Sequence, residues 1–416
     1  MKRPIAPARL GRFEVGAKIG GGGMAQVYIG RAIREGDDAA DGAPEELVAL
    51  KVIRDEFVDD PEFLLMFSDE ARLLARLAHP HVIRTLEHGA TDGHRYIAME
   101  LLSGRTLADV WDSLVQADER LEPRLAAWIC ARVAEGLDAA HDATDEDDAP
   151  LGIIHRDVNP TNIFLTHTGG VKLIDFGLAK ARRRSTKSAD GIVKGKIPYL
   201  APEQLHLKKN ELDRRIDIYA LGATLWELVT MRRLFKKETD VDTLRAIRDA
   251  IIPDARTLAD VPDELWAIID RALQRDRDER HATAEEVRAE LDTFVGGASD
   301  EMAEQLVALM LRLYPGEEAQ QNEWMRSAAH SARRLKATVA PPAPVPTASS
   351  DLLRDERPSD PGPEPAGDAE PSAMRPRLSS RPPAEVVRPG ANRPWFSLVL
   401  LALVILAVAV LFVSRR

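Results

Sequence analysis

Two stretches near the middle of the chain decide the fold: residues 153–165 read IIHRDVNPTNIFL, and residues 171–177 read VKLIDFG. In the first stretch an apolar run leads into the triplet HRD, which ends at Asp157, and a tight polar loop then reaches Asn162. In the second stretch a short apolar strand ends at Asp175. The pattern HRDxxxxN followed by DFG at this distance is too specific to have arisen by chance.

A glycine cluster lies between two strand candidates near the N-terminus, where residues 19–28 read IGGGGMAQVY. Glycines let the backbone approach phosphate oxygens and expose N–H donors to them, although a flexible hairpin is the alternative. The stretch fits the pattern GxGxxGxV at Gly20, Gly22 and Val27, with Ala25 in the third glycine position. No Gly-Lys-Ser/Thr follows, so it does not fit the P-loop pattern.

A lysine closes the third apolar strand candidate, where residues 48–51 read VALK. A lysine at the end of such a strand needs a partner, and Glu70 on the following helical stretch is the natural candidate. A Lys51–Glu70 pair would hold the ammonium group where it can contact nucleotide phosphates. An ion pair at the surface is the alternative interpretation.

Together with the triplet APE at residues 201–203, these motifs resemble the protein kinase family, and more closely the eukaryotic-type Ser/Thr kinases of bacteria. The resemblance covers residues 13–294 in the order of the family. Asp217, Gly222 and Arg280 match residues that anchor the large lobe in that family. The resemblance implies an α+β, two-lobed fold with a small β-rich N-lobe and a large α-helical C-lobe.

The periodicity of the first hundred residues agrees with a small β-rich lobe. Short apolar stretches bounded by turn residues predict strands over residues 13–19, 26–32, 47–53, 85–88 and 96–100. Helical spacing of apolar residues predicts a helix over residues 61–77. After Gly104 the pattern becomes mostly helical, and residues 298–336 are expected to form a further helical extension.

The resemblance implies phosphoryl transfer from ATP to Ser and Thr hydroxyls of proteins, with autophosphorylation, in bacterial signalling. Asp157 would orient the substrate hydroxyl and accept its proton, and Lys51, held by Glu70, would contact the α- and β-phosphates. Mg²⁺ would be held by Asn162 and Asp175, which offer the oxygen ligands that this cation prefers.

The nucleotide site implied by the resemblance comprises Ile19, Gly20, Gly22, Val27, Ala49, Lys51, Met99, Glu100, Leu102, Asn162, Phe164 and Asp175. Adenine would lie between Val27 and Ala49 on one side and Phe164 on the other. Met99 would be the gatekeeper, and the backbone of Glu100 and Leu102 would pair with the adenine edge.

Two positions depart from the pattern of Ser/Thr kinases. Asn159 stands where lysine usually follows the catalytic aspartate by two residues, and Lys196 stands where threonine usually follows Gly195. We hypothesise that the two changes compensate, with the ammonium of Lys196 taking the catalytic place of the absent one. A pseudokinase that binds nucleotide or partner proteins without transfer is the chief alternative, and the departures also leave Tyr specificity open.

The loop between DFG and APE contains Ser185, Thr186 and Ser188 among several basic residues. A phosphate on one of these hydroxyls would pair with Arg156 and order the loop. A solvated basic loop is the alternative interpretation.

Composition limits the other possibilities. The net charge of −11 over 416 residues argues against a protein that coats nucleic acid. Cys130 is the single cysteine, so an internal disulfide is excluded and the folded part needs no oxidising compartment. We interpret Cys130, which lies in an apolar helical stretch, as a small buried hydrophobe rather than a reactive thiol.

The last part of the chain predicts a membrane anchor. Residues 337–394 are rich in proline and polar residues, which predicts a disordered linker. Residues 395–413 read WFSLVLLALVILAVAVLFV without a charge. At about 1.5 Å per residue this run spans roughly 28 Å, close to the hydrocarbon thickness of a bilayer. A buried core helix is the alternative, but the run is apolar on every face.

More arginines precede the apolar run than follow it, so the positive-inside bias places the large N-terminal part in the cytoplasm. The expectation is a single-pass protein of the cytoplasmic (inner) membrane that acts on protein substrates. A homodimer stays open, because the run has small residues but no GxxxG.

Overall fold

The computed structural model describes residues 8–22, 24–33, 46–176, 197–206 and 211–338. By its contacts the chain divides into two units, residues 1–343 and 344–416, and the second lies wholly outside the described residues. The predicted linker and membrane helix therefore fall outside the description. Among the helices that the structure describes, none is long and apolar enough to cross a membrane.

The N-terminal part forms a six-stranded antiparallel sheet in the order β1-β2-β3-β4-β6-β5. The strands are β1 (Arg9–Leu10), β2 (Phe13–Gly21), β3 (Ala25–Ala32), β4 (Leu47–Ile53), β5 (Thr85–Thr91) and β6 (His94–Glu100). Five of them confirm the strands predicted from the sequence, with ends shifted by a few residues. The two-residue β1 was missed, because so short a strand carries no periodic pattern.

Each face of this sheet is covered by its own apolar cluster. One cluster contains Phe13, Tyr28 and Leu50. The other joins Ala49 and Met99 to side chains of the helix α1 (Pro61–Leu74). The central strand β4 is buried on both faces, which explains its nearly continuous apolar sequence.

The helix α1 begins where the sequence predicts it. Asp60 caps its first turn, with its carboxylate accepting a hydrogen bond from Phe63 N at 3.0 Å, and Pro61 occupies the first helical position. The helix ends at Leu74 rather than at 77. Its last turn tightens, since the amides of Arg76 and Leu77 bond to carbonyls three residues back.

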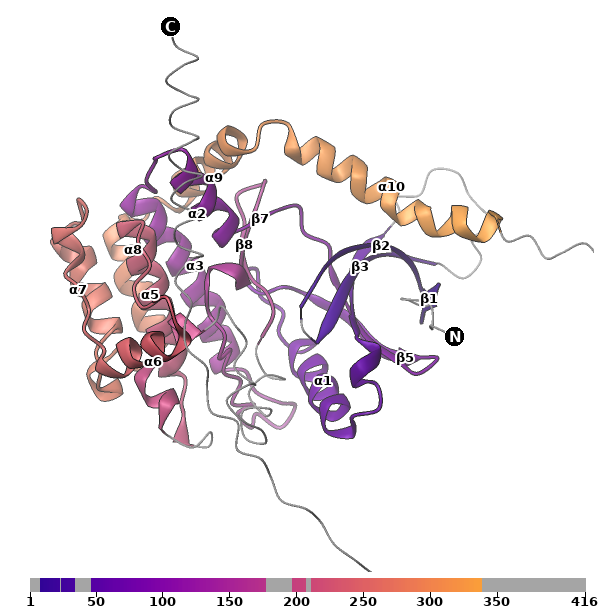
Figure 1. The fold of residues 1–416 in the computed structure, drawn as a ribbon, viewed down its shortest axis with the longest axis horizontal. Coiled ribbons are helices and arrows are strands. Elements are labelled where there is room, and N and C mark those ends of the chain that lie inside the picture. Colours follow the sequence, from indigo (N-terminus) through magenta and orange to yellow (C-terminus); the bar gives the residue numbers. More distant parts are fainter. Residues whose placement is uncertain (1–7, 23, 34–45, 177–196, 207–210, 339–416) are drawn as a thin grey trace, which may run out of the picture. The chain divides into compact units, whose positions relative to one another are not determined.

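The second lobe is helical and lies beside the sheet lobe (Figure 1). Its helices are α2 (Leu107–Gln116), α3 (Pro123–His141), α5 (Arg215–Thr230), α6 (Asp240–Asp249), α7 (Asp263–Ala272) and α8 (Ala284–Val295). A small antiparallel sheet joins this lobe to the first, in the order β7 (Gly104–Thr106), β8 (Ile163–Thr166) and β9 (Val171–Leu173).

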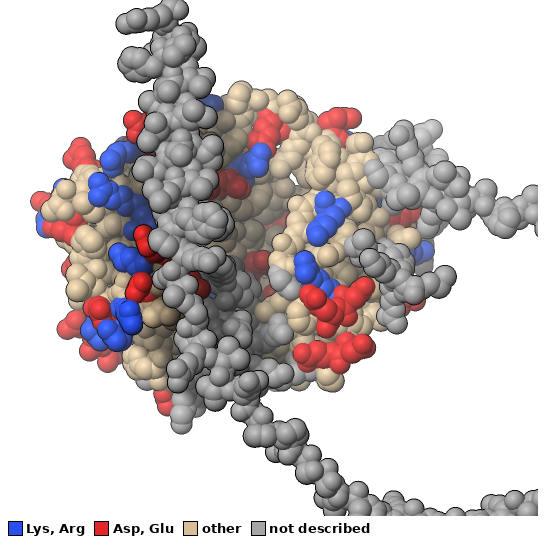
Figure 2. Space-filling view, in the orientation of Figure 1, with Lys and Arg blue, Asp and Glu red and all other residues tan. Residues whose placement is uncertain are grey.

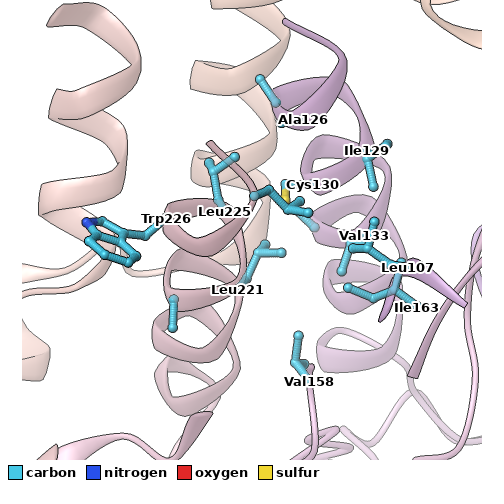
Figure 3. Packing of buried hydrophobic residues seen from close by; sticks show 14 of the residues in the cluster. Leu107, Ala126, Ile129, Cys130, Val133, Val158, Ile163, Leu221, Leu225 and Trp226 are labelled. Carbon is cyan, nitrogen blue, oxygen red and sulfur yellow. The ribbon is translucent and has the colours of Figure 1, made fainter. Parts of the chain in front are cut away.

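The core of the helical lobe is built around α3 and α5, whose apolar side chains face one another (Figure 3). Cys130 of α3 lies there beside Leu221 and Leu225 of α5, is fully buried and is not in a disulfide. Burial raises the pKa of its thiol well above the ordinary value. The interpretation of Cys130 as a small buried hydrophobe is therefore confirmed.

Within the described residues, two helices follow the second lobe in the chain. The first, α9 (Ser299–Leu313), buries Met302, Leu306 and Met310 in the helical core. The second, α10 (Glu317–Thr338), leaves that lobe and packs against β2 and β3 of the sheet lobe (Figure 1). The helix α10 therefore contacts the sheet lobe, which the N-terminal part of the chain forms.

Acidic and basic side chains are interspersed on the face shown in Figure 2, over both lobes. No large basic patch is visible on this face among the residues that the structure describes.

Candidate active site

Three of the predicted polar residues meet between the two lobes. Lys51, on β4, places its Nζ 3.1 Å from Glu70 Oε1 on α1 and 2.8 Å from Asp175 Oδ1. Burial on its own would lower the pKa of Lys51, but the two carboxylates outweigh it and raise the pKa above the ordinary value. The ammonium group therefore stays charged throughout the neutral range.

Asp157 and Asn162, which lie in the loop between α3 and β8, are also in contact. Asn162 donates from its Nδ2 to Asp157 Oδ2 at 2.8 Å and to Asp157 O at 2.7 Å. The backbone carbonyl of Asn162 accepts a hydrogen bond from Ile174 N at 2.8 Å. Asn162 thereby connects Asp157 to the strand end that carries Asp175.

Asn159, the first departure from the family pattern, is turned into its own loop. Its side chain is 2% exposed, donates to Asp157 O at 2.7 Å and accepts from Thr161 N at 3.0 Å. It therefore shapes the loop rather than projecting a charge from it. Lys196, the second departure, lies outside the described residues, as do Ser185, Thr186 and Ser188.

The backbone just before Asp157 is fixed by hydrogen bonds to the side chain of Asp217, on α5. The buried carboxylate of Asp217 accepts hydrogen bonds from His155 N at 2.8 Å, from Arg156 N at 2.7 Å and from His141 Nε2 at 2.8 Å. Burial alone would raise the pKa of Asp217, but these partners hold it below the ordinary value. Asp217 therefore anchors this loop as a buried carboxylate.

Arg156 adopts a left-handed backbone conformation, with φ of 63°, that a side chain disfavours. Such a conformation persists only where the surroundings determine it, and here Asp217 holds the amide of Arg156. The strained residue directly precedes Asp157. Asp175 has the same backbone class, with φ of 59°.

A buried aromatic pair links α1 to the same loop. The ring of Phe176, next to Asp175, lies 4.3 Å from the ring of His155. Phe176 also packs in a cluster with Leu74 of α1 and Ile153. Because these side chains are in contact, the position of α1, which carries Glu70, depends on the conformation at Asp175.

The residues expected around adenine form an apolar wall. Val27, Ala49, Met99 and Leu102 belong to one cluster, in which Ala49 and Met99 are paired across β4 and β6. Phe164 is half-buried on β8.

Glu100 makes additional polar contacts at the end of β6. Its Oε1 accepts from Lys172 Nζ at 2.6 Å and from Arg84 N at 2.8 Å. The Glu100 side chain is therefore occupied by Lys172 and Arg84. Its backbone carbonyl is the group predicted to pair with the adenine edge.

The glycine cluster turns from β2 to β3, with Gly22 N donating to Ala25 O at 2.9 Å. A Cβ placed on Gly20 or Gly22 would have no atom within 4 Å. Their lack of a side chain is therefore not required by packing within the chain. Ile19, on the same strand, is among the exposed large hydrophobic residues.

The APE segment is fixed by a buried ion pair. Arg280 directs its two terminal nitrogens to the two carboxylate oxygens of Glu203, at 2.8 and 2.9 Å. Such a two-point contact fixes geometry as well as charge. A small pocket lies between this segment and the loop of Asp157, lined in part by Tyr199 and Gln204.

A model of the protein kinase domain matches residues 13–291 of this chain. The chain belongs to the protein kinase family. The match confirms the family and the two-lobed fold that the motifs indicated.

Relatives of this kinase occur in several bacteria. It is 37% identical to the tyrosine-protein kinase MasK of Myxococcus xanthus, 35% to the serine/threonine-protein kinase PknB of Mycolicibacterium smegmatis and 34% to PrkC of Bacillus subtilis. These alignments cover 68%, 67% and 68% of this chain, and 43%, 42% and 40% of the respective relatives.

Among solved structures, the kinase domain of Mycobacterium tuberculosis PknI is 26% identical, with a TM-score of 0.49 over 68% of this chain and 96% of its own length.

Sequence reasoning missed two residues near the site of this kinase. His141, at the end of α3, donates a hydrogen bond from its Nε2 to the Asp217 carboxylate, yet a lone histidine in an apolar helix gives no signal of that contact. Gln321 of α10 contacts the backbone after β6, and nothing in its local sequence points there. Both contacts join residues far apart in the chain.

Proposed function

We propose that this chain is an ATP- and Mg²⁺-dependent protein kinase that transfers the γ-phosphoryl group to Ser and Thr hydroxyls of proteins, itself included, in bacterial signalling. The observation that carries the proposal is the contact of Lys51 with both Glu70 and Asp175. In this fold the Lys–Glu pair must be in place for transfer, and the aspartate holds the metal.

The arrangement of the polar residues assigns their roles. Lys51, charged and fixed by two carboxylates, would neutralise the α- and β-phosphates. Asp157, oriented by the amide of Asn162 at 2.8 Å, would accept the proton of the substrate hydroxyl. Val27, Ala49 and Met99 would enclose the adenine ring, and the turn at Gly20 and Gly22 would cover the phosphates. Together these residues would place the substrate hydroxyl beside the terminal phosphate of ATP.

The donor set fits Mg²⁺. Asp175 and Asn162 offer one carboxylate and one amide oxygen, which are hard ligands, and no group of three or more His, Cys, Asp or Glu side chains forms a separate metal site within the described residues. Mg²⁺ binds well to few protein ligands because nucleotide phosphates and water supply the rest. When bound, the metal would neutralise charge on the transferred group.

Lys196 belongs to the same proposal. Asn159 has a neutral amide, buried in its loop, at the position where Ser/Thr kinases carry lysine, so no positive charge is supplied there. A transferring site needs that charge. We assign it to Lys196, which follows Gly195 before the APE segment.

A pseudokinase is the alternative. The chain retains Lys51, Glu70, Asp157, Asn162 and Asp175, and the contacts among them favour an active enzyme. The hydroxyl specificity is also part of the proposal, because the relatives include kinases named for serine/threonine and one named for tyrosine.

Membrane attachment is proposed from the apolar run at residues 395–413 and the arginines that precede it. The kinase domain would then face the cytoplasm of a bacterial cell, tethered to the inner membrane by one helix. Membrane fractionation of the chain with and without residues 395–413 tests this. Recovery of both forms in the same fraction would refute it.

Radiolabelled ATP tests the enzymatic proposal. The full chain, incubated with γ-³²P-ATP, Mg²⁺ and a Ser/Thr-rich protein, is expected to label itself and the substrate on phosphoserine or phosphothreonine. Asp157→Asn and excess EDTA should each abolish the label. Nucleotide binding without transfer would establish the pseudokinase, and phosphotyrosine as the product would reassign the specificity.

A further inference from the structure

The helix α10 contacts the segment that joins the two lobes, residues 101–103 between β6 and β7, here called the hinge. Gln321 Oε1 accepts hydrogen bonds from Gly104 N at 2.9 Å and from Ser103 Oγ at 3.0 Å. Gln321 Nε2 lies 3.5 Å from Gly104 O. One side chain outside residues 13–291 therefore holds two neighbouring residues just after Leu102, which the proposed function places at the adenine edge.

The same helix packs on the sheet lobe. Met325, Ala328 and Ala329 are buried against Ile29 of β3. Leu101, in the segment between the lobes, packs against this cluster and also against the cluster that contains Ala49 and Met99. The apolar contact of α10 is thus continuous with the predicted adenine wall.

The approach of α10 to β2 is close enough to exclude a side chain. A Cβ on Gly16 would lie 2.6 Å from Ala328 O and 3.1 Å from Ala329 Cα. The strand β2 continues from Gly16 into the glycine turn. Any displacement of α10 therefore acts on the strand that positions this turn.

The other end of the helix pair is anchored in the C-lobe. Tyr314 OH lies 2.8 Å from Ser113 Oγ of α2, and Glu317 Oε1 lies 2.5 Å from Arg105 Nη2 of β7. The helix α9 is buried in the core of the same lobe. The helix α9 is fixed to the C-lobe and α10 to the sheet lobe. The two helices therefore form a second connection between the lobes, in addition to the hinge (Figure 1).

We infer that Gln321 is a positioning residue for nucleotide binding, because it holds the Ser103–Gly104 segment at the end of the hinge. Through this contact α10 would keep the hinge and the glycine turn at the separation that ATP binding requires. This rests on the proposed function of the cleft as an ATP site. The hydrogen bonds of Gln321 go to Ser103 and Gly104, not to the residues proposed to contact ATP. It would therefore change the affinity for ATP through the backbone that it holds.

Three variants of the full chain test the inference. Gln321→Leu removes the acceptor, Gln321→Glu retains an acceptor oxygen, and Gln320→Leu changes an exposed glutamine on the same helix as the matched control. The Kd for a fluorescent ATP analogue, and KM and kcat for ATP, are measured for each, together with hydrogen exchange of residues 100–106.

We expect Gln321→Leu to raise Kd and KM for ATP by roughly 3- to 10-fold, the size of one or two lost hydrogen bonds, with kcat within twofold. Exchange of residues 100–106 should accelerate in the same variant. Gln321→Glu should recover most of the affinity, and Gln320→Leu should match wild type. Unchanged affinity in Gln321→Leu, or equal losses in the Leu and Glu variants, would overturn the inference.

A fourth variant covers the case in which Gln321→Leu fails to fold. Gly16→Ala leaves Gln321 intact but forces α10 away from β2, so it should raise KM for ATP in the same direction. Wild-type affinity in Gly16→Ala would count against the inference.

The outcomes separate this inference from the function on which it rests. If the wild type binds the analogue without transferring phosphate, the kinase activity fails while the comparison of Kd values still decides the role of Gln321. If the wild type binds no nucleotide, both fail. If it binds and transfers, but the variants bind equally well, only the inference fails.

Discussion

The Nζ of Lys51 lies 3.1 Å from the Oε1 of Glu70, a carboxylate whose side chain is only 2% exposed. A buried carboxylate is costly unless it is paired, so this contact fixes the distance between α1 and β4. The second contact of Lys51, to Asp175 at 2.8 Å, joins the same ammonium group to the other lobe. Both contacts of Lys51 can form together only when α1 and the two lobes are correctly placed.

The first prediction concerns Glu70. Glu70→Gln should lower kcat/KM roughly 10- to 100-fold, because the negative charge that holds Lys51 is lost and only a neutral amide oxygen can still accept its hydrogen bond. The neighbouring Asp69→Asn is the control, since the Asp69 side chain is 41% exposed on the same helix. Steady-state kinetics with ATP compare the two. Equal activity of the two variants would show that the pair is not needed.

The second prediction concerns Lys196. Lys196→Ala should lower kcat roughly 100-fold if its ammonium group neutralises charge during transfer. Adding Asn159→Lys to that variant should recover part of the loss. The recovery will be incomplete, because Asn159 also holds the backbone of Asp157 at 2.7 Å. Wild-type kinetics in Lys196→Ala would remove the compensation hypothesis.

The third prediction concerns the buried pair of Arg280 and Glu203. Arg280→Met should lower the free energy of unfolding by about 3 kcal/mol or more, because it leaves the Glu203 carboxylate buried and unpaired. Arg271→Met provides the comparison, since Arg271 pairs with Glu286 and Glu290 at the surface. Urea unfolding should show a much smaller change for it. Similar losses for both variants would mean that burial of the pair is unimportant.

The fourth prediction concerns the pH dependence of stability. The folded-state pKa of Asp217 lies below its ordinary value, so the stability it contributes is present above about pH 4 and is lost as pH falls through the folded pKa. Asp217→Asn should therefore be destabilised by at least about 2 kcal/mol at pH 7. The difference from wild type should shrink below about pH 4 in urea titrations. A difference independent of pH would contradict this linkage.

The residues of the site were predictable because their motifs are local. HRDxxxxN, DFG, VALK and APE each occupy a few consecutive positions, and their types and spacing point to one chemistry. Most strands of the sheet lobe were also predictable, since alternating burial leaves a period-2 pattern. The strand β4, which is buried on both faces, was predictable from its nearly continuous apolar run instead. The end of α1 was not, because a tightened last turn depends on the chain that follows.

The sequence by itself determined the family and the two lobes, and its short patterns singled out Lys51, Asp157, Asn162 and Asp175 as site candidates. Glu70 lies outside these patterns and was only a candidate partner on the following helical stretch, until the structure placed it 3.1 Å from Lys51. Only the tertiary structure decided that Asn159 turns into its loop, that Asp217 holds the backbone before Asp157, and that α10 returns to the sheet lobe. Such contacts join residues far apart in the chain. They depend on the packing of whole elements, which leaves no periodic signal at either partner.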